Sequence, residues 1–252
     1  MTVQAGDAGV IYYKLRTDAT PERTKNGVKL VSWEWGTDEE IAAMLEAAHN
    51  GTIDLQTDGL WEIGDVRQVD IGAWSGGGRS FDATTRPLVI SSFAEYEGCG
   101  NVMQFDFLTI VNNRGVRMND TGVNRYSESE MKTSTLPALI DALPSWLKNA
   151  LITFSVKVGA GNNSSSIETV TGNKLALRSE VEITGTHDHS AAGEGSQVDL
   201  YRDSLYRTKY SSSTGYWLRS PYGTSMYYYC TDGSIGRQSA NSTEALAPFG
   251  CL

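Results

Sequence analysis

The chain has 252 residues and a formal net charge of −9, and 40% of its residues are hydrophobic. This length and composition suffice for one large domain with its own core, or for a domain with a smaller attached segment. The acidic balance, together with the lack of a basic stripe interleaved with aromatic residues, argues against a nucleic-acid partner.

The N-terminus shows neither the basic nor the apolar region of a signal peptide, and the sequence has no run of about 18 apolar residues. We therefore expect a product made in the cytoplasm, with no membrane insertion. Cys99, Cys230 and Cys251 are odd in number and widely spaced, with no CxxC pattern. They predict buried free thiols rather than a disulfide framework or a zinc site, and we expect no metal and no cofactor.

Residues 1–50 are expected to form an attachment or oligomerisation segment of strands and one helix. The strands are predicted at Val10–Leu15 and Val28–Trp35, and Trp33 and Trp35 are candidates for an interface or for a cap on the domain core. Thr37 and Glu40 then have capping-box spacing. The apolar residues that follow keep one helical face until Asn50-Gly51, namely Ile41, Met44, Leu45 and Ala48.

Strands punctuated by turns follow, at Trp61–Ile71, Leu88–Phe93 and Val102–Val111. The run Ser75-Gly-Gly-Gly-Arg79 is interpreted as a flexible loop. It shares only its glycine content with a phosphate-binding loop, because it lacks the GK[ST] ending and a following helix.

A second helix is predicted over residues 136–151, where Leu and Ile residues keep one face. Pro137 suits its first turn, and Pro144 predicts a kink or a break into two short helices. Ile152, Phe154, Val156 and Val158 then alternate as in a central strand, before a turn over residues 159–166.

Residues 185–215 are polar and contain glycine, which predicts a long ordered excursion. His187-Asp-His189 within it offers ordinary metal-ligand types. Two histidines in a loop without a third cluster are usually solvated, so we favour the solvated interpretation and predict no metal site.

The last fifty or so residues are rich in tyrosine, interleaved with Ser, Gly, Thr and Asn. Eight of the chain's 12 tyrosines lie there, at positions 201, 206, 210, 216, 222, 227, 228 and 229. This mixture is typical of binding surfaces, because Tyr supplies amphipathic contact area at low entropy cost while the small polar residues adapt their hydrogen bonds. The alternative is a Tyr-rich β-sandwich surface, since aromatic residues also favour strands.

A hairpin is predicted near the C-terminus, with strands at Met226–Thr231 and Ser234–Ser239. Asp232-Gly233 between them suits a type I′ turn.

The C-terminal motifs resemble those of a phage and prophage family of C-type-lectin-like variable proteins, the targets of diversity-generating retroelements. They are Tyr216-Trp-Leu-Arg-Ser-Pro-Tyr222, then Asp232-Gly-Ser234 and Leu246-Ala-Pro-Phe-Gly-Cys-Leu252. Weaker similarity reaches upstream through Gly51-Thr-Ile-Asp-Leu55 and Trp61-Glu-Ile-Gly-Asp-Val-Arg67. The resemblance therefore covers about residues 50–252, and residues 51–252 are expected to be the ligand-binding domain.

This resemblance implies an α+β, C-type-lectin-like fold, with a mixed twisted sheet, two flanking helices and a variable C-terminal hairpin, similar in architecture to the major tropism determinants of temperate phages. It implies a fixed scaffold of Trp217, Arg219, Ser220, Pro221, Asp232, Gly233, Pro248 and Phe249. It also implies displayed, ligand-binding positions at Tyr222, Gly223, Thr224, Ser225, Tyr227, Tyr229, Gly236, Arg237, Ser239 and Asn241.

By the same resemblance, we expect a virion-borne receptor-binding protein, for example in a tail fibre, that adheres to a host cell-surface protein or glycan. It would assemble with other virion proteins, most plausibly as a homotrimer. A structural virion protein without a ligand, such as a tail or head decoration, is the alternative.

An enzyme is the third class, because formylglycine-generating oxidases share the lectin-like fold. Their chemistry needs reactive cysteines or metal-bound thiolates. Cys230 and Cys251 have no nearby His or basic activator in the sequence, so we predict no catalytic residues and no enzymatic activity.

Overall fold

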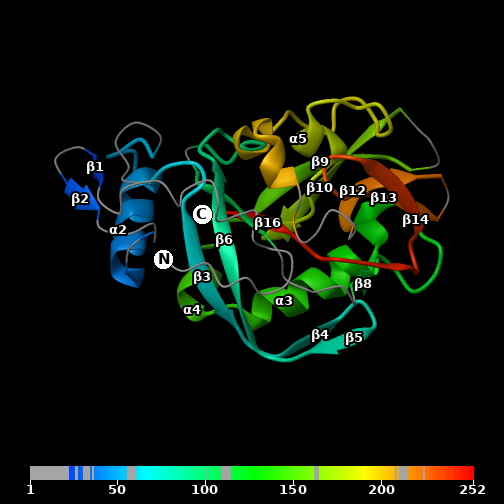
Figure 1. Ribbon diagram of the computed structural model, residues 1–252, viewed down its shortest axis with the longest axis horizontal. Coiled ribbons are helices and arrows are strands. Elements are labelled where there is room, and N and C mark those ends of the chain that lie inside the picture. Colours follow the sequence, from blue (N-terminus) through cyan, green and yellow to red (C-terminus); the bar gives the residue numbers. More distant parts are fainter. Residues whose placement is uncertain are drawn as a thin grey trace.

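The computed structural model describes residues 23–25, 28–30, 35, 37–55, 61–100, 102–108, 115–161, 165–207, 209, 215–223 and 225–252, with the backbone alone for 23–25, 28–30 and 205. The protein is an α+β structure with several antiparallel sheets and few helices (Figure 1). Its longest dimension runs from strands β1 (Arg23–Lys25) and β2 (Val28–Leu30), beside helix α2 (Asp38–His49), at one end to strand β14 (Ile235–Ser239) at the other.

A five-stranded antiparallel sheet forms the centre, in the order β11-β16-β7-β6-β3. The C-terminal strand lies inside this sheet, between strands from the middle of the chain. The bounds of its strands are β3 Val66–Ile71, β6 Thr84–Ser92, β7 Gln104–Phe107, β11 Leu175–Ala176 and β16 Phe249–Cys251.

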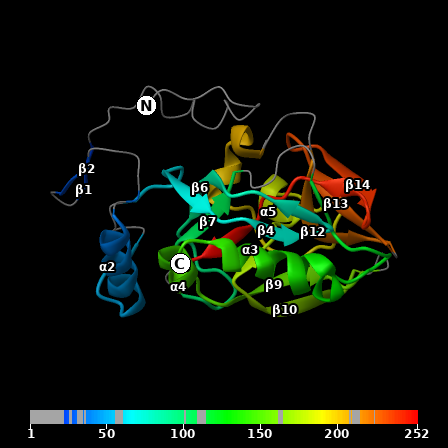
Figure 2. The same ribbon diagram turned by 90° about the horizontal axis from the view of Figure 1, so that it is seen from below.

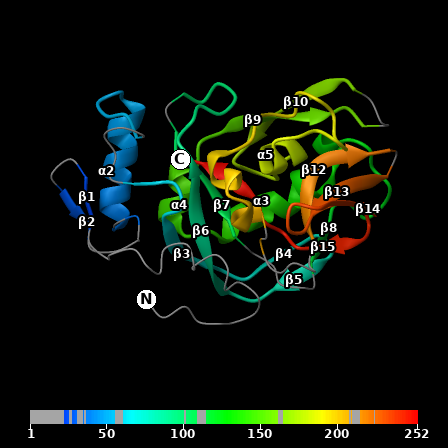
Figure 3. The same cartoon turned by 45° about the horizontal axis from the view of Figure 1, so that its top comes forward.

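A second sheet, β12-β13-β14, is built from β12 (Tyr216–Tyr222), β13 (Met226–Cys230) and β14, and Figure 3 shows it beside β9 and β10. The remaining strands form two-stranded ladders. These pair β1 (Arg23–Lys25) with β2 (Val28–Leu30), β4 (Trp74–Gly76) with β5 (Arg79–Phe81), β8 (Val116–Arg117) with β15 (Thr243–Glu244), and β9 (Phe154–Gly159) with β10 (Ile167–Asn173).

The two helical regions predicted from the sequence are present. The capping box of Thr37 and Glu40 opens α2, and the predicted apolar face is buried at Ile41, Leu45 and Ala48. Pro144 separates α3 (Leu136–Ala142) from α4 (Ser145–Ala150), which confirms the predicted break. Short helical turns complete the structure: a π-helical turn at Met131–Thr135, α5 at Glu180–Thr184, and 3₁₀ turns at Tyr126–Glu128, Asp199–Arg202 and Ser204–Arg207.

One face of the central sheet is apolar. The register places Phe105 opposite Ile90 and Phe107 opposite Leu88, so these side chains share a face, and all four are fully buried. A Cβ built on Gly250 would lie 2.7 Å from the Phe105 ring, so the sheet needs glycine there for the ring to lie flat on it. This face joins α2, α3 and α4 in one core (Figure 2).

The other face of the sheet carries buried ions. Asp106 alternates with the two phenylalanines on β7 and is fully buried. Arg178 donates to both of its carboxylate oxygens, with the shortest distance 2.7 Å, and Lys209 Nζ lies 3.1 Å from Oδ1. The Tyr201 hydroxyl donates to the same Oδ1 at 2.6 Å.

These contacts set the charge state of Asp106. Burial by itself raises the pKa of a carboxyl group, but Arg178 and Lys209 outweigh it, so the pKa of Asp106 lies well below its ordinary value. The excursion that carries Tyr201 and Lys209 is therefore ionically fixed onto the sheet.

Two expectations for the middle of the chain are wrong. Ser75–Arg79 is not a flexible loop but the tip of the β4–β5 hairpin, where Gly77 and Gly78 have φ of 57° and 79°, as a type I′ turn requires. Strand β9 is present as predicted, but within the described residues it pairs with β10 alone, so it is not a central strand.

The N-terminal segment is described in part. Strand β2 covers the start of the predicted strand Val28–Trp35, whereas Val10–Leu15 and Trp33 lie outside the described residues. Trp35 is not an exposed interface residue, because it is 3% exposed and packs at 6.3 Å from the Phe105 ring. Helix α2 thus shares its core with the region that follows residue 50.

The buried carboxylate gives a stability prediction. Asp106→Asn leaves Arg178 and Lys209 buried without their counter-charge, which typically costs about 3–5 kcal/mol. We expect urea denaturation to show a loss of this size, while Asp141→Asn, at an exposed position in α3, changes stability by less than about 0.5 kcal/mol. Equal effects of the two substitutions would contradict the role given to Asp106.

Candidate functional site

The register of the second sheet decides which side chains share its outer face. Tyr222 pairs with Met226, and Met226 pairs with Ser239. Tyr228 pairs with Arg237 and lies two residues from Met226, so it points to the same side. One face of the sheet therefore carries Tyr222, Met226, Tyr228, Arg237 and Ser239.

An aromatic and cationic cluster lies on this face. The Tyr222 and Tyr228 rings meet edge to face, with centroids 5.5 Å apart. The Arg237 guanidinium lies 4.5 Å from the Tyr222 ring centroid, in cation–π range, and His189 of the excursion lies 5.9 Å from Tyr228. Arg237 itself is exposed, and Tyr222 is partly exposed.

A small cleft of about 250 Å³ opens beside this cluster. Two segments face the tyrosines across it: the turn after β9, with Gly159, Gly161 and Ser165, and residues 189–192 of the excursion. The Ser190 Oγ is buried there and has no hydrogen-bond partner among the described residues. The cleft is thus lined by aromatic rings, a hydroxyl group and the backbone of two glycines.

Glu180 holds the excursion side of the cleft in place. Its carboxylate accepts hydrogen bonds from the backbone N–H groups of His189, at 3.1 Å, and of Ser190, at 2.5 Å. Burial, followed by the charge of Glu180, raises the pKa of Tyr228 to about 12, so this hydroxyl stays protonated at neutral pH. It can therefore donate a hydrogen bond.

The expected display of Tyr227 is wrong. Its side chain is fully buried in the main core. Tyr229, on the same side of β13, is partly buried against that core, where a Cβ on Gly215 or Gly236 would come within 2.3 Å of its ring. Gly236 therefore faces the core side as well, because only a glycine leaves room for the ring.

The other expected display positions lie at or near the surface. Gly223 and Ser225 are partly exposed at the β12–β13 turn, Ser239 is partly exposed, and Arg237 and Asn241 are exposed. Thr224 lies outside the described residues. Of the nine expected residues that the structure describes, Tyr222, Arg237 and Ser239 share the outer face with Tyr228.

The scaffold beneath the outer face matches the sequence-based expectation. Trp217 is fully buried, and its Nε1–H donates to the Val116 carbonyl at 2.6 Å. Arg219 is also fully buried and donates to the carbonyls of Lys157, Leu177 and Glu194, at 3.0, 2.8 and 2.6 Å, and to the Glu182 carboxylate. It is the planar multi-donor clamp that the motif predicts.

One scaffold contact at Ser220 adds to that expectation, and the turn at Asp232-Gly233 differs from it. The Ser220 hydroxyl donates to the buried Glu194 carboxylate, which also accepts from the Gly159 N–H at 2.6 Å. In the hairpin turn, Gly233 has φ of 104°, but Asp232 does not have positive φ. The turn is therefore not the expected type I′, which needs positive φ at both central residues.

Sequence reasoning missed Tyr228 and His189. Three consecutive tyrosines carry no alternation, so their pattern could not show which side of the sheet each one faces, and Tyr228 is itself only 6% exposed. Cys230 lies on the same side of β13 as Tyr228, and both side chains are buried in a second core cluster, so burial of the cysteine does not mark Tyr228 as a surface residue. His189 was considered only as a metal ligand.

The described residues contain no group of three or more His, Cys, Asp or Glu side chains placed to hold a metal ion. Cys230 and Cys251 are buried free thiols as expected, whereas Cys99 is only partly buried. Among the described helices, none is both long and apolar enough to cross a membrane.

Residues 102–252 match the model of DUF6273, a domain of unknown function. The match spans more than half of the chain, so the protein belongs to this family. No curated protein matches the chain, and no solved structure does. The matched region contains β7, β16 and the whole second sheet, and it therefore includes the outer face and its scaffold.

A partly buried carboxyl group near the second sheet makes stability depend on pH. Burial raises the pKa of Glu244 from 4.5 to about 7. Between these values the folded chain binds more protons than the unfolded chain, so the contribution of Glu244 to stability falls as pH rises from 4.5 to 7.

We therefore expect Glu244→Gln to melt at a higher temperature than the unmodified protein at pH 8, because the substitution removes the free-energy cost of a partly buried, ionised carboxylate. Each kcal/mol of that cost corresponds to about 2–4 °C in melting temperature. At pH 4.5 the two proteins should melt at nearly the same temperature. Calorimetry at several pH values checks this. Glu46→Gln, at an exposed position, is the control. If Glu244→Gln changed the melting temperature equally at every pH, the raised pKa of Glu244 would be wrong.

Proposed function

We propose that the C-terminal sheet is a recognition surface, and that the protein is a non-enzymatic ligand-binding protein. The observation that carries this proposal is the cluster of Tyr222, Tyr228 and Arg237 beside an open cleft, held above a fully buried scaffold. Tyrosine and arginine are the residue types most often found at binding hot spots.

Buried residues of the sheet fix its backbone while exposed residues face solvent, and this separation supports a binding role. Trp217 and Arg219 have all their polar groups directed into the protein, so they fix the backbone of β12. Arg237 and Asn241 face solvent, and exposed side chains can change without disturbing the core. A rigid backbone beneath replaceable side chains reduces the entropy lost when a ligand binds.

The finer proposal rests on the resemblance of the C-terminal motifs. It is that the sheets form a C-type-lectin-like fold and that the protein acts on a phage virion, where it attaches to a host cell-surface protein or glycan. Homo-oligomerisation, as a trimer, would place several such faces on one particle and raise the effective affinity by about 10² to 10⁴. A structural virion protein without a ligand is the competing proposal.

The outer face gives a direct test. Tyr222→Ala and Arg237→Ala should each weaken adhesion by more than tenfold, because truncating such residues at a hot spot costs on the order of 2 kcal/mol. Binding of the purified protein to immobilised bacterial cells and to a glycan array measures this. Arg237→Ala should keep the melting temperature because Arg237 is exposed, and Tyr222→Ala should lower it by less than Tyr227→Ala because Tyr222 is only partly buried, at the edge of the second core cluster.

Two controls separate binding from folding. Arg79→Ala, at an exposed position in the β4–β5 hairpin, should leave adhesion unchanged. Tyr227→Ala should lower the melting temperature, because Tyr227 is fully buried. Unchanged adhesion by Tyr222→Ala and Arg237→Ala would reject this surface, and no adhesion by the unmodified protein to any cell or glycan would favour the structural virion role.

A further inference from the structure

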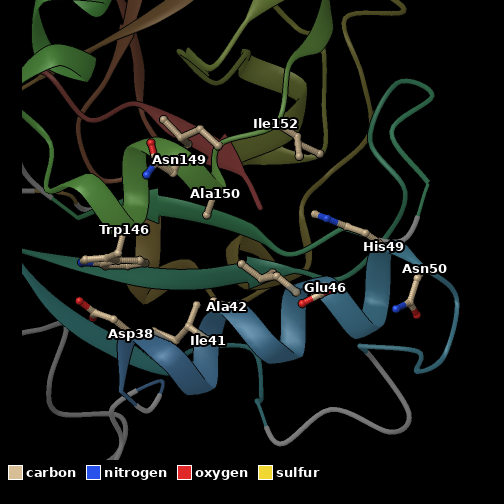
Figure 4. Close-up of a pocket in the computed structure, with 12 residues that line it drawn as sticks. Asp38, Ile41, Ala42, Glu46, His49, Asn50, Trp146, Asn149, Ala150 and Ile152 are labelled. Carbon is tan, nitrogen blue, oxygen red and sulfur yellow. The ribbon is translucent and has the colours of Figure 1, made fainter.

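A groove of about 710 Å³ runs between α2 and α4, at the end of the molecule away from the outer face of the second sheet (Figure 4). One wall is α2, from Asp38 to Asn50, and the other is α4 with the residues that follow it, through Ile152. Ile41, Leu45 and Leu151 form its apolar floor, and Ala42 and Ala150 add small apolar side chains.

Trp146 stands at one end of the groove and is only partly buried. Its ring is fixed from two sides: the Arg67 guanidinium lies 4.6 Å from the ring centroid, and Trp35 meets it edge to face at 6.5 Å. Arg67 also forms an ion pair with Asp38 on the opposite wall. A fixed, partly exposed tryptophan is a common anchor for a partner protein.

The shape of the groove favours a helical segment over a small molecule. The lining residues extend along all 12 residues of α2, which corresponds to about 18 Å at 1.5 Å per residue. A compact ligand would contact only part of this length. A helix of similar length can place one apolar face on the floor.

The charges at the rim favour a basic partner. Asp38 is paired with Arg67, so the wall formed by α2 presents Glu46 as its rim charge, and the first turn adds the exposed Glu39 and Glu40, of which Glu40 also accepts the Thr37 N–H. Arg67, the described basic side chain beside Trp146, is already engaged with Asp38 and with the tryptophan ring. A second copy of a chain with net charge −9 is a poor match for this rim.

We infer that this groove is a docking site for an amphipathic helix of another protein, with apolar residues on one face and Lys or Arg residues beside them. The groove lies at the opposite end of the molecule from the outer face, so both can be occupied together (Figure 1). The inference does not depend on the function proposed for the second sheet.

A model peptide tests the inference. The probe is a 14-residue helical peptide of Leu and Lys, with Leu at i, i+3, i+4 and i+7, and its counterpart has Glu in place of Lys. Calorimetric titration of the full chain should show binding of the Leu/Lys peptide alone. Glu46→Lys, which reverses a rim charge, and Ala42→Arg, which fills the groove from an exposed helical position, should each weaken binding at least tenfold.

Asp82→Lys is the matched control, because it makes the same charge change at an exposed position that does not line the groove. It should leave the affinity within about twofold of the unmodified protein. Failure of the Leu/Lys peptide to bind, or equal losses in Glu46→Lys and Asp82→Lys, would overturn the inference. So would a dimer in light scattering that Ala42→Arg dissociates, because the groove would then hold a second copy of this chain.

Discussion

The buried carboxylate of Asp106 is the constraint around which the two halves of the structure are organised. A carboxylate in the centre of a sheet must be matched by charge and hydrogen bonds, because burial disfavours its ionised form. The partners come from far along the chain: Arg178 enters from the segment after β11, and Tyr201 and Lys209 come from the excursion. A polar, glycine-bearing segment thereby covers the sheet.

Arg219 extends this framework from the central sheet to the second one. It lies in the irregular part of β12, between the residues that pair with Tyr229 and Tyr227, and it joins the carbonyls of three separate segments to Glu182. The same Glu182 accepts the Tyr96 hydroxyl. The outer face therefore rests on a backbone that is fixed from below.

Sequence reasoning predicted the elements whose causes are local. The capping box of Thr37 and the break at Pro144 depend on a few neighbouring residues, and the structure has both. It could not predict outcomes set by distant residues. Nothing near Asp106 in the sequence shows that Arg178 and Lys209, more than 70 residues further along the chain, pair with it in the core. The direction of Tyr227 is decided by register with Gln238 and by the room that glycines give to Tyr229, and neither is visible in a run of identical residues.

The position of the two surfaces follows from the same architecture. The central sheet separates α2 from the second sheet in every view, so a partner in the groove approaches one end of the molecule and a ligand the other (Figure 2). The groove lies partly on α2, which precedes the region shared with the DUF6273 family, whereas the outer face lies entirely within it. The groove therefore uses residues outside the matched region, and so do strands β3 and β6 of the central sheet, whereas Asp106 and its partners Arg178, Tyr201 and Lys209 lie within it.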